Sequence, residues 1–173
     1  MGGRFQTPAG RTALGGVLAA GSLAVLWLAC LSPTGQVGLT AVAGLFPVAA
    51  VLAAGRWAAV LCWAAASVLG LLVLPGKGVA LLFLVFFGIY PVVKSRLEIQ
   101  KNRGLEWLGK LAHFNLAFTI IWLGAGSLLL ETFPVWLTKS LPLLYGAGNV
   151  VFVAYDIALS RLIGVMAARL RRR

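Results

Sequence analysis

The chain has 173 residues, of which 61% are hydrophobic and only 11% are charged, and its formal net charge is +11. With a mean hydropathy of +0.96, it lies far from the composition of soluble globular domains, which excludes an ordinary water-soluble fold. No nucleic-acid-binding motif accompanies the positive charge, so we expect no nucleic-acid partner. We interpret the charge as a signal of membrane orientation and as attraction to anionic lipid headgroups, with the lipid bilayer as the first partner.

Six apolar runs are long enough to cross a bilayer, since a spanning helix needs about 20 mostly apolar residues. The second run is the shortest, and none shows the alternation of a barrel strand, so all six are predicted to be helical. The expected spans are 12–31, 37–54, 57–75, 77–94, 107–130 and 140–165, with a loop at 95–106 and a basic tail at 166–173. The sequence therefore predicts an all-α fold, a six-helix integral membrane bundle that forms a single domain over residues 1–173.

The first run admits a second interpretation. It follows Arg4 and Arg11 and ends at 28–30 with Leu-Ala-Cys, an arrangement similar to the lipobox of a lipoprotein signal peptide. Trp27 stands where such a box has leucine, and the run is long for the core of a signal peptide, so a retained helix is favoured. Cleavage would leave five spans and an external N-terminus.

The second run contains Pro47 near its middle, which removes one helical hydrogen bond and predicts a kink. The kink is either tolerated packing or an irregular segment that lines a cavity, and both interpretations stay open.

Basic residues fall into alternate gaps between the spans. Because lysine and arginine near span ends resist translocation, the side that collects most of them is expected to be the cytoplasm. That side holds Arg4, Arg11, Arg56, Lys94, Arg96, Lys101, Arg103, Lys110, Arg161, Arg169 and Arg171 to Arg173, whereas the other side holds only Lys77 and Lys139. We therefore expect a multi-pass protein of the cell membrane with both termini in the cytoplasm.

Polar residues at membrane depth form two groups, and each such residue is expected to have a partner or a role. The inner thirds of the last three spans predict an ion-paired and hydrogen-bonded cluster of Tyr90, Lys94, Lys110, His113, Asn115, Asp156 and Arg161. A structural clasp is favoured over a proton relay for this cluster. The outer ends of the spans offer a ligand pocket with aromatic walls, although ordinary loop chemistry explains the same set: Trp122, Glu131, Trp136, Tyr145 and Asn149.

Small residues recur every four positions in the first and third spans, where they let helix backbones approach closely. In the first span they are Gly16, Ala20 and Ala24. Internal packing is favoured for such a row, and a partner interface is the alternative.

No metal-binding HExxH pair, nucleophile turn or phosphate-binding loop occurs in the sequence, and the four acidic residues are not spaced as ligands or as an acid/base pair. We expect no enzyme activity, no metal and no cofactor.

The architecture resembles that of the S components of energy-coupling-factor (ECF) transporters. In that family an AxxxA face of the first helix docks a transmembrane coupling subunit, and Ala20 and Ala24 match such a face. The segment 45–50, followed by Gly55, is similar to the second helix of S-component-like proteins. The resemblance implies a membrane-embedded subunit that binds and transports an unidentified small molecule and depends on a coupling subunit and ATPases for energy.

Two short segments, 88–94 with Glu98 and 110–115, resemble a group of uncharacterised small bacterial inner-membrane proteins, a likeness that implies no function. The alternative to transport is a non-transporting membrane scaffold in cell-envelope assembly, similar in size and helix number to MreD-like proteins. The cluster at the inner ends and the loop at 95–106 would then be the working surface.

Overall fold

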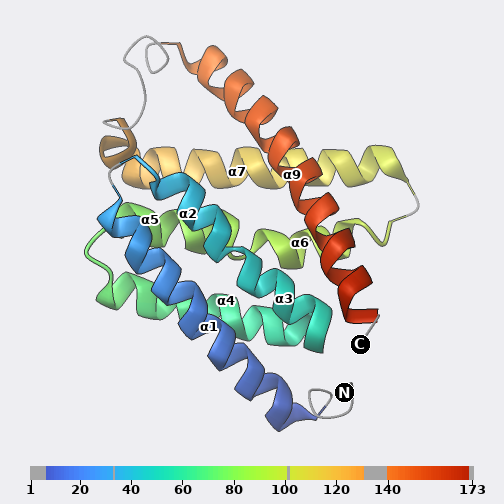
Figure 1. Ribbon diagram of the computed structural model, residues 1–173. Helices are drawn as coiled ribbons and strands as arrows, with labels where there is room; N and C mark the ends of the chain where they lie inside the picture. Colours follow the sequence, from blue (N-terminus) through green and yellow to red (C-terminus); the bar gives the residue numbers. More distant parts are fainter. Residues whose placement is uncertain (1–6, 33, 101, 131–139, 172–173) are drawn as a thin grey trace.

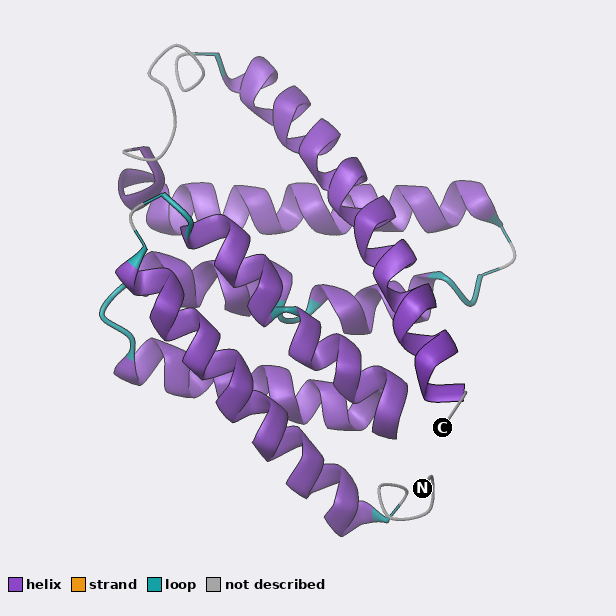
Figure 2. Cartoon of the chain, viewed as in Figure 1, coloured by secondary structure: helices purple, strands orange, loops and turns teal. Residues whose placement is uncertain are grey.

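The computed structural model describes residues 7–32, 34–100, 102–130 and 140–171, with side chains described up to 124 in the third of these ranges and up to 169 in the last. Within these ranges the chain is all-helical, as predicted (Figures 1 and 2). The elements are α1 (Pro8–Leu31), α2 (Gln36–Ala43), α3 (Leu45–Ala54), α4 (Arg56–Val73), α5 (Lys77–Leu82), the π-helix η1 (Phe83–Phe87), α6 (Tyr90–Leu97), α7 (Arg103–Leu130) and α9 (Leu141–Arg171).

Five stretches in the described part of the chain are long and apolar enough to cross a membrane: Pro8–Leu31, Gln36–Ala54, Arg56–Val73, Lys77–Leu97 and Leu141–Arg169. They correspond to five of the six predicted spans, which is consistent with a multi-pass membrane protein. The remaining predicted span lies in α7. Over its described side chains α7 is less apolar, because Lys110, His113 and Asn115 occupy its first half.

The second span is interrupted at Gly44, between α2 and α3. Pro47 has no N–H, so the carbonyl of Ala43, four residues earlier, loses its helical donor. The hydroxyl of Ser22 in α1 donates to that carbonyl at 3.3 Å, so a neighbouring helix satisfies the freed group. A Cβ atom on Gly44 would lie 2.6 Å from the carbonyl oxygen of Phe87, and the break can therefore pack against η1 only because residue 44 is glycine.

The fourth span contains a second irregularity, the π-helix η1. The N–H of Gly88 donates to the carbonyl of Phe83, five residues earlier, at 2.8 Å. In an α-helix it would bond Leu84 instead, and the carbonyl of Leu84 accepts the indole N–H of Trp63 in α4 at 2.8 Å. Trp63 therefore supports the backbone of the neighbouring span inside the bundle.

Close backbone contact between α1 and α4 holds the first half together. A Cβ atom on Gly15 would lie 3.1 Å from the carbonyl oxygen of Ala58 and 3.2 Å from Cβ of Leu61. The small-residue row of the third predicted span is fully buried here: Ala58, Cys62, Ala66 and Gly70. That row serves internal packing.

In Figure 1, α4, the α5–η1–α6 span and α7 run in nearly the same direction, whereas α1, the α2–α3 span and α9 cross them obliquely. The start of α1 and the end of α9 lie on the same side of the molecule as the α3–α4 turn and the α6–α7 connection. The α1–α2 and α4–α5 turns lie on the opposite side.

Candidate functional site

The most unusual group in the described structure is a buried carboxylate, Asp156 of α9, which faces α6 and α7. Its Oδ1 accepts hydrogen bonds from the hydroxyl of Tyr90, at 2.6 Å, and from the ammonium of Lys94. Its Oδ2 accepts from the ammonium of Lys110 at 3.1 Å. All four side chains are buried, with Lys94 only 1% and Asp156 only 2% exposed. The structure thus brings together four of the residues predicted to form an inner cluster.

Two further carboxylates complete the group, and neither was among the predicted members. Glu98 Oε1 lies 2.6 Å from Lys94 Nζ and 3.2 Å from Lys110 Nζ, and Glu106 Oε1 lies 2.7 Å from Lys110 Nζ. Both could have been found from the sequence, because the pairs 94/98 and 106/110 have the i,i+4 spacing that places side chains on one face of a helix. We call Asp156, Lys94, Lys110, Glu98 and Glu106 the charge cluster.

The charge cluster contains three carboxylates and two ammonium groups, a formal charge of −1 when all are ionised, within a chain whose net charge is +11. Buried charges are tolerated when they are paired and hydrogen-bonded, as these are. Among the described residues, no group of three or more His, Cys, Asp and Glu side chains is arranged to hold a metal ion.

Three other predicted members lie apart from the charge cluster. His113 stacks beside Tyr90, with ring centroids 5.8 Å apart, and its buried Nε2 has no hydrogen-bond partner in the described structure. Asn115 pairs with Asn149 instead. Arg161 is exposed on α9, because five residues beyond Asp156 a helix has turned well away from the same face.

Polar contacts also join α7 to α9 further along the two helices. The side-chain amides of Asn115 and Asn149 bond each other reciprocally, at 3.0 and 3.1 Å. One helical turn further on, the hydroxyls of Thr119 and Tyr145 lie 2.8 Å apart. Together with Lys110 and Asp156 they form three successive polar contacts between antiparallel helices.

The predicted outer pocket is described only in part. Phe118 stacks on Trp122, with centroids 6.5 Å apart, and meets Tyr145 edge-on at 5.0 Å, so these rings form one aromatic group. The polar groups of Tyr145 and Asn149 are hydrogen-bonded to Thr119 and Asn115 of α7. Glu131 and Trp136 lie outside the described residues.

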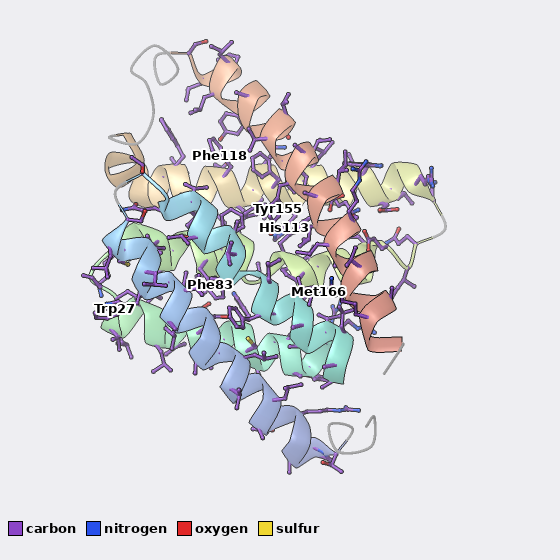
Figure 3. All side chains as sticks on the ribbon, viewed as in Figure 1. Trp27, Phe83, His113, Phe118, Tyr155 and Met166 are labelled. Carbon is purple, nitrogen blue, oxygen red and sulfur yellow. The ribbon has the colours of Figure 1, made fainter. Side chains whose placement is uncertain are left out.

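A second aromatic group surrounds Phe86 of η1. Its ring contacts those of Tyr90, Phe114, Phe152 and Tyr155 at centroid distances of 5.4 to 5.9 Å. Figure 3 shows Phe83, His113 and Tyr155 within the interior of the bundle, whereas Trp27 lies at its edge.

The predicted partner face on α1 is directed outward. Gly16, Ala20 and Ala24 are all exposed, and a Cβ atom on Gly16 would meet nothing within 4 Å. The inward face of α1 is instead formed by Gly15, Ala19 and Ser22. The face at Gly16, Ala20 and Ala24 is therefore not used for packing within the described structure.

A cleft of about 180 Å³ lies between α3, α6 and α9, next to the charge cluster. We call it the α3–α6–α9 cleft. Its lining consists of Val48, Val51, Leu52, Pro91, Lys94, Ser95, Glu98 and Ile163. The walls are mostly apolar, and the polar side chains come from α6 alone.

Comparison with models of protein families, with curated proteins and with solved structures gives no match for this chain.

Proposed function

We propose that the protein is a membrane-embedded subunit that binds a small molecule and depends on partner subunits for energy, as its resemblance to S components implies. The observation that supports this best is the α3–α6–α9 cleft, because an apolar cleft with a few polar groups at one end is the usual form of a small-molecule site. The buried charge cluster beside it supplies the intramembrane ionisable groups that mark many solute pathways.

The proposal includes six crossings, with α7 as the fifth, and both termini in the cytoplasm. The distribution of basic residues supports this orientation, as does the common side on which α1 begins and α9 ends (Figure 1). In that orientation the charge cluster and the cleft lie toward the cytoplasm.

Cysteine labelling tests the orientation. In a chain whose own Cys30 and Cys62 are replaced by alanine, single cysteines are introduced at Lys77, Ser140 or Gln100. A membrane-impermeant maleimide added to intact cells is expected to label positions 77 and 140 but not 100, whereas position 100 is labelled after lysis. Labelling of position 100 in intact cells, with 77 and 140 protected, contradicts the proposed topology.

The transport role is tested by what the protein carries and what it binds. Mass spectrometry of gently extracted protein is expected to detect a copurifying small molecule. Affinity purification is expected to recover a coupling subunit and ATPases, and Gly16→Leu together with Ala20→Leu is expected to abolish that recovery. The outward position of both residues allows the substitution without disturbing the bundle. If neither a bound molecule nor such subunits are found, the proposal fails.

A scaffold role in cell-envelope assembly is the second candidate, favoured by the exposed basic residues Arg96 and Arg103 beside the α6–α7 connection. Envelope proteins would then be recovered by pull-down. Their recovery should survive Tyr145→Ala and Asn149→Ala but be lost on reversal of charge at Arg96 and Arg103. If the protein instead binds a ligand at the outer ends of α7 and α9, ligand binding should be lost in Tyr145→Ala and Asn149→Ala. It should then survive the charge reversals at Arg96 and Arg103.

A further inference from the structure

The α3–α6–α9 cleft combines two features that restrict its occupant, namely its size and the chemistry of its polar end. At about 180 Å³ it is smaller than the roughly 300 Å³ at which sites for drug-sized ligands begin. Val48, Val51, Leu52, Pro91 and Ile163 supply apolar walls on three helices. A short apolar body with a single polar group therefore fits its dimensions.

Lys94, which lines the cleft, and Lys110, the other lysine of the charge cluster, have no capacity left for an anionic ligand. An ammonium group has three N–H donors. Those of Lys94 face Asp156, Ser160 and Glu98, and those of Lys110 face Glu98, Glu106 and Asp156. A carboxylate or phosphate placed here would have to displace one of these partners.

Glu98, in contrast, retains an unused acceptor at the cleft. Both lysines contact the same oxygen, Oε1, which leaves Oε2 for another donor. The side chain of Glu98 is 40% exposed, more than any other member of the charge cluster. The hydroxyl of Ser95 donates to the carbonyl of Val92 at 2.8 Å, so its oxygen too is free to accept.

The electrostatics of the surroundings also favour a positively charged ligand. The charge cluster has a formal charge of −1, which a bound monocation would neutralise. The cleft also lies near the C-terminal ends of α3 and α6, where helix carbonyls concentrate partial negative charge. Arg96 is exposed and, two residues from Lys94, lies on another side of α6.

We infer that the α3–α6–α9 cleft binds a small amphipathic amine, whose ammonium group donates to Glu98 while its apolar body contacts α3 and α9. The inference rests on the proposed small-molecule binding and specifies its ligand class. In the proposed orientation the site opens toward the cytoplasmic half of the membrane.

Three probes of equal chain length test the inference on the full-length protein in phosphatidylcholine nanodiscs: n-hexylamine, n-hexanol and n-hexanoate. The nanodiscs contain no anionic lipid, and empty nanodiscs correct for partitioning. Titration calorimetry at neutral pH is expected to show hexylamine, which is protonated there, binding about tenfold more tightly than hexanol. Hexanoate is expected to bind more weakly than hexanol.

Two matched variants separate contact with Glu98 from the overall charge of the cluster. Glu98→Gln removes the carboxylate that lines the cleft and should reduce hexylamine affinity to that of hexanol. Glu106→Gln removes the same charge from a residue that does not line the cleft and should change hexylamine affinity by no more than about threefold. Val51→Phe fills the cleft and should abolish binding of both probes.

The outcomes distinguish this inference from the function on which it rests. If hexanol binds the unaltered protein as tightly as hexylamine, or if the two glutamine variants lose affinity equally, the cationic ligand class is overturned. If no probe binds the unaltered protein, the cleft is not the binding site. The proposed function is judged separately, by the copurifying molecule and the coupling subunit.

Discussion

The first half of the molecule packs through glycine and alanine, whereas in the second half α6, α7 and α9 meet through ammonium groups, carboxylates, amides and aromatic rings. Within the most apolar 18-residue stretch of each candidate span, 56% of the residues are buried in Lys77–Leu97 but only 17% in Leu141–Arg169. The attachment of α9 therefore depends on a few specific side chains. In lipid, where apolar side chains gain little by associating, such groups determine which helices stay together.

The largest effect is expected when Asp156 is removed. Asp156→Ala removes the buried carboxylate through which Lys94 and Lys110 hold α9, which should cost about 3–5 kcal/mol and release α9. Thermal unfolding in detergent measures the loss, and a cysteine introduced at the buried position Leu159 reports the release through maleimide labelling. Ile157→Ala, on the exposed face of α9, is the control. Equal stability of Asp156→Ala and the control would show that α9 is held by its apolar contacts.

A smaller effect is expected from an added methyl group in the first half. Gly44→Ala places a Cβ atom against the backbone carbonyl of Phe87, which cannot rotate away, so we expect a loss of about 1–3 kcal/mol. Gly16→Ala makes the same chemical change where nothing lies within 4 Å and should leave stability unchanged. The difference between their unfolding temperatures measures how closely the two irregular segments pack. No difference would contradict the contact.

The smallest effect concerns the amide pair between α7 and α9. Interhelical hydrogen bonds in membranes contribute about 0.6 kcal/mol on average, so Asn115→Leu should be mildly destabilising. Combining it with Asn149→Leu removes both partners and should restore part of the loss, because no unpaired amide remains. A double-mutant cycle gives the coupling energy. Strict additivity would show that the two amides do not interact.

Much of the helical pattern could be predicted, because long apolar runs and punctuating charges are local properties of a sequence. Pro47 predicts the interruption near Gly44, and the cost of a buried carboxylate predicts that Asp156 has cationic partners. The separation of Asn115 from the charge cluster could not be foreseen, since its pairing with Asn149 depends on the register between α7 and α9. The prediction that Arg161 joins this cluster was wrong. Arg161 is close to Asp156 in sequence, but its position around α9 places it on the exposed side of the helix.

The π-helix was equally inaccessible to prediction, because residues 83–87 read as an ordinary apolar run. The indole N–H that satisfies its free carbonyl, at Leu84, belongs to Trp63 in another helix, and only the fold brings the two together.

That irregular turn also sets the rotational phase of the helix that follows it. It holds one residue more than an α-helical turn, and each residue advances a helix by about 100°. Deleting one of the five residues Phe83 to Phe87 would therefore swing Tyr90 and Lys94 away from α9, with every charged side chain still present in the chain. The direction in which the Lys94 ammonium points is therefore set by the one extra residue in the turn Phe83–Phe87, which precedes Lys94 in the chain.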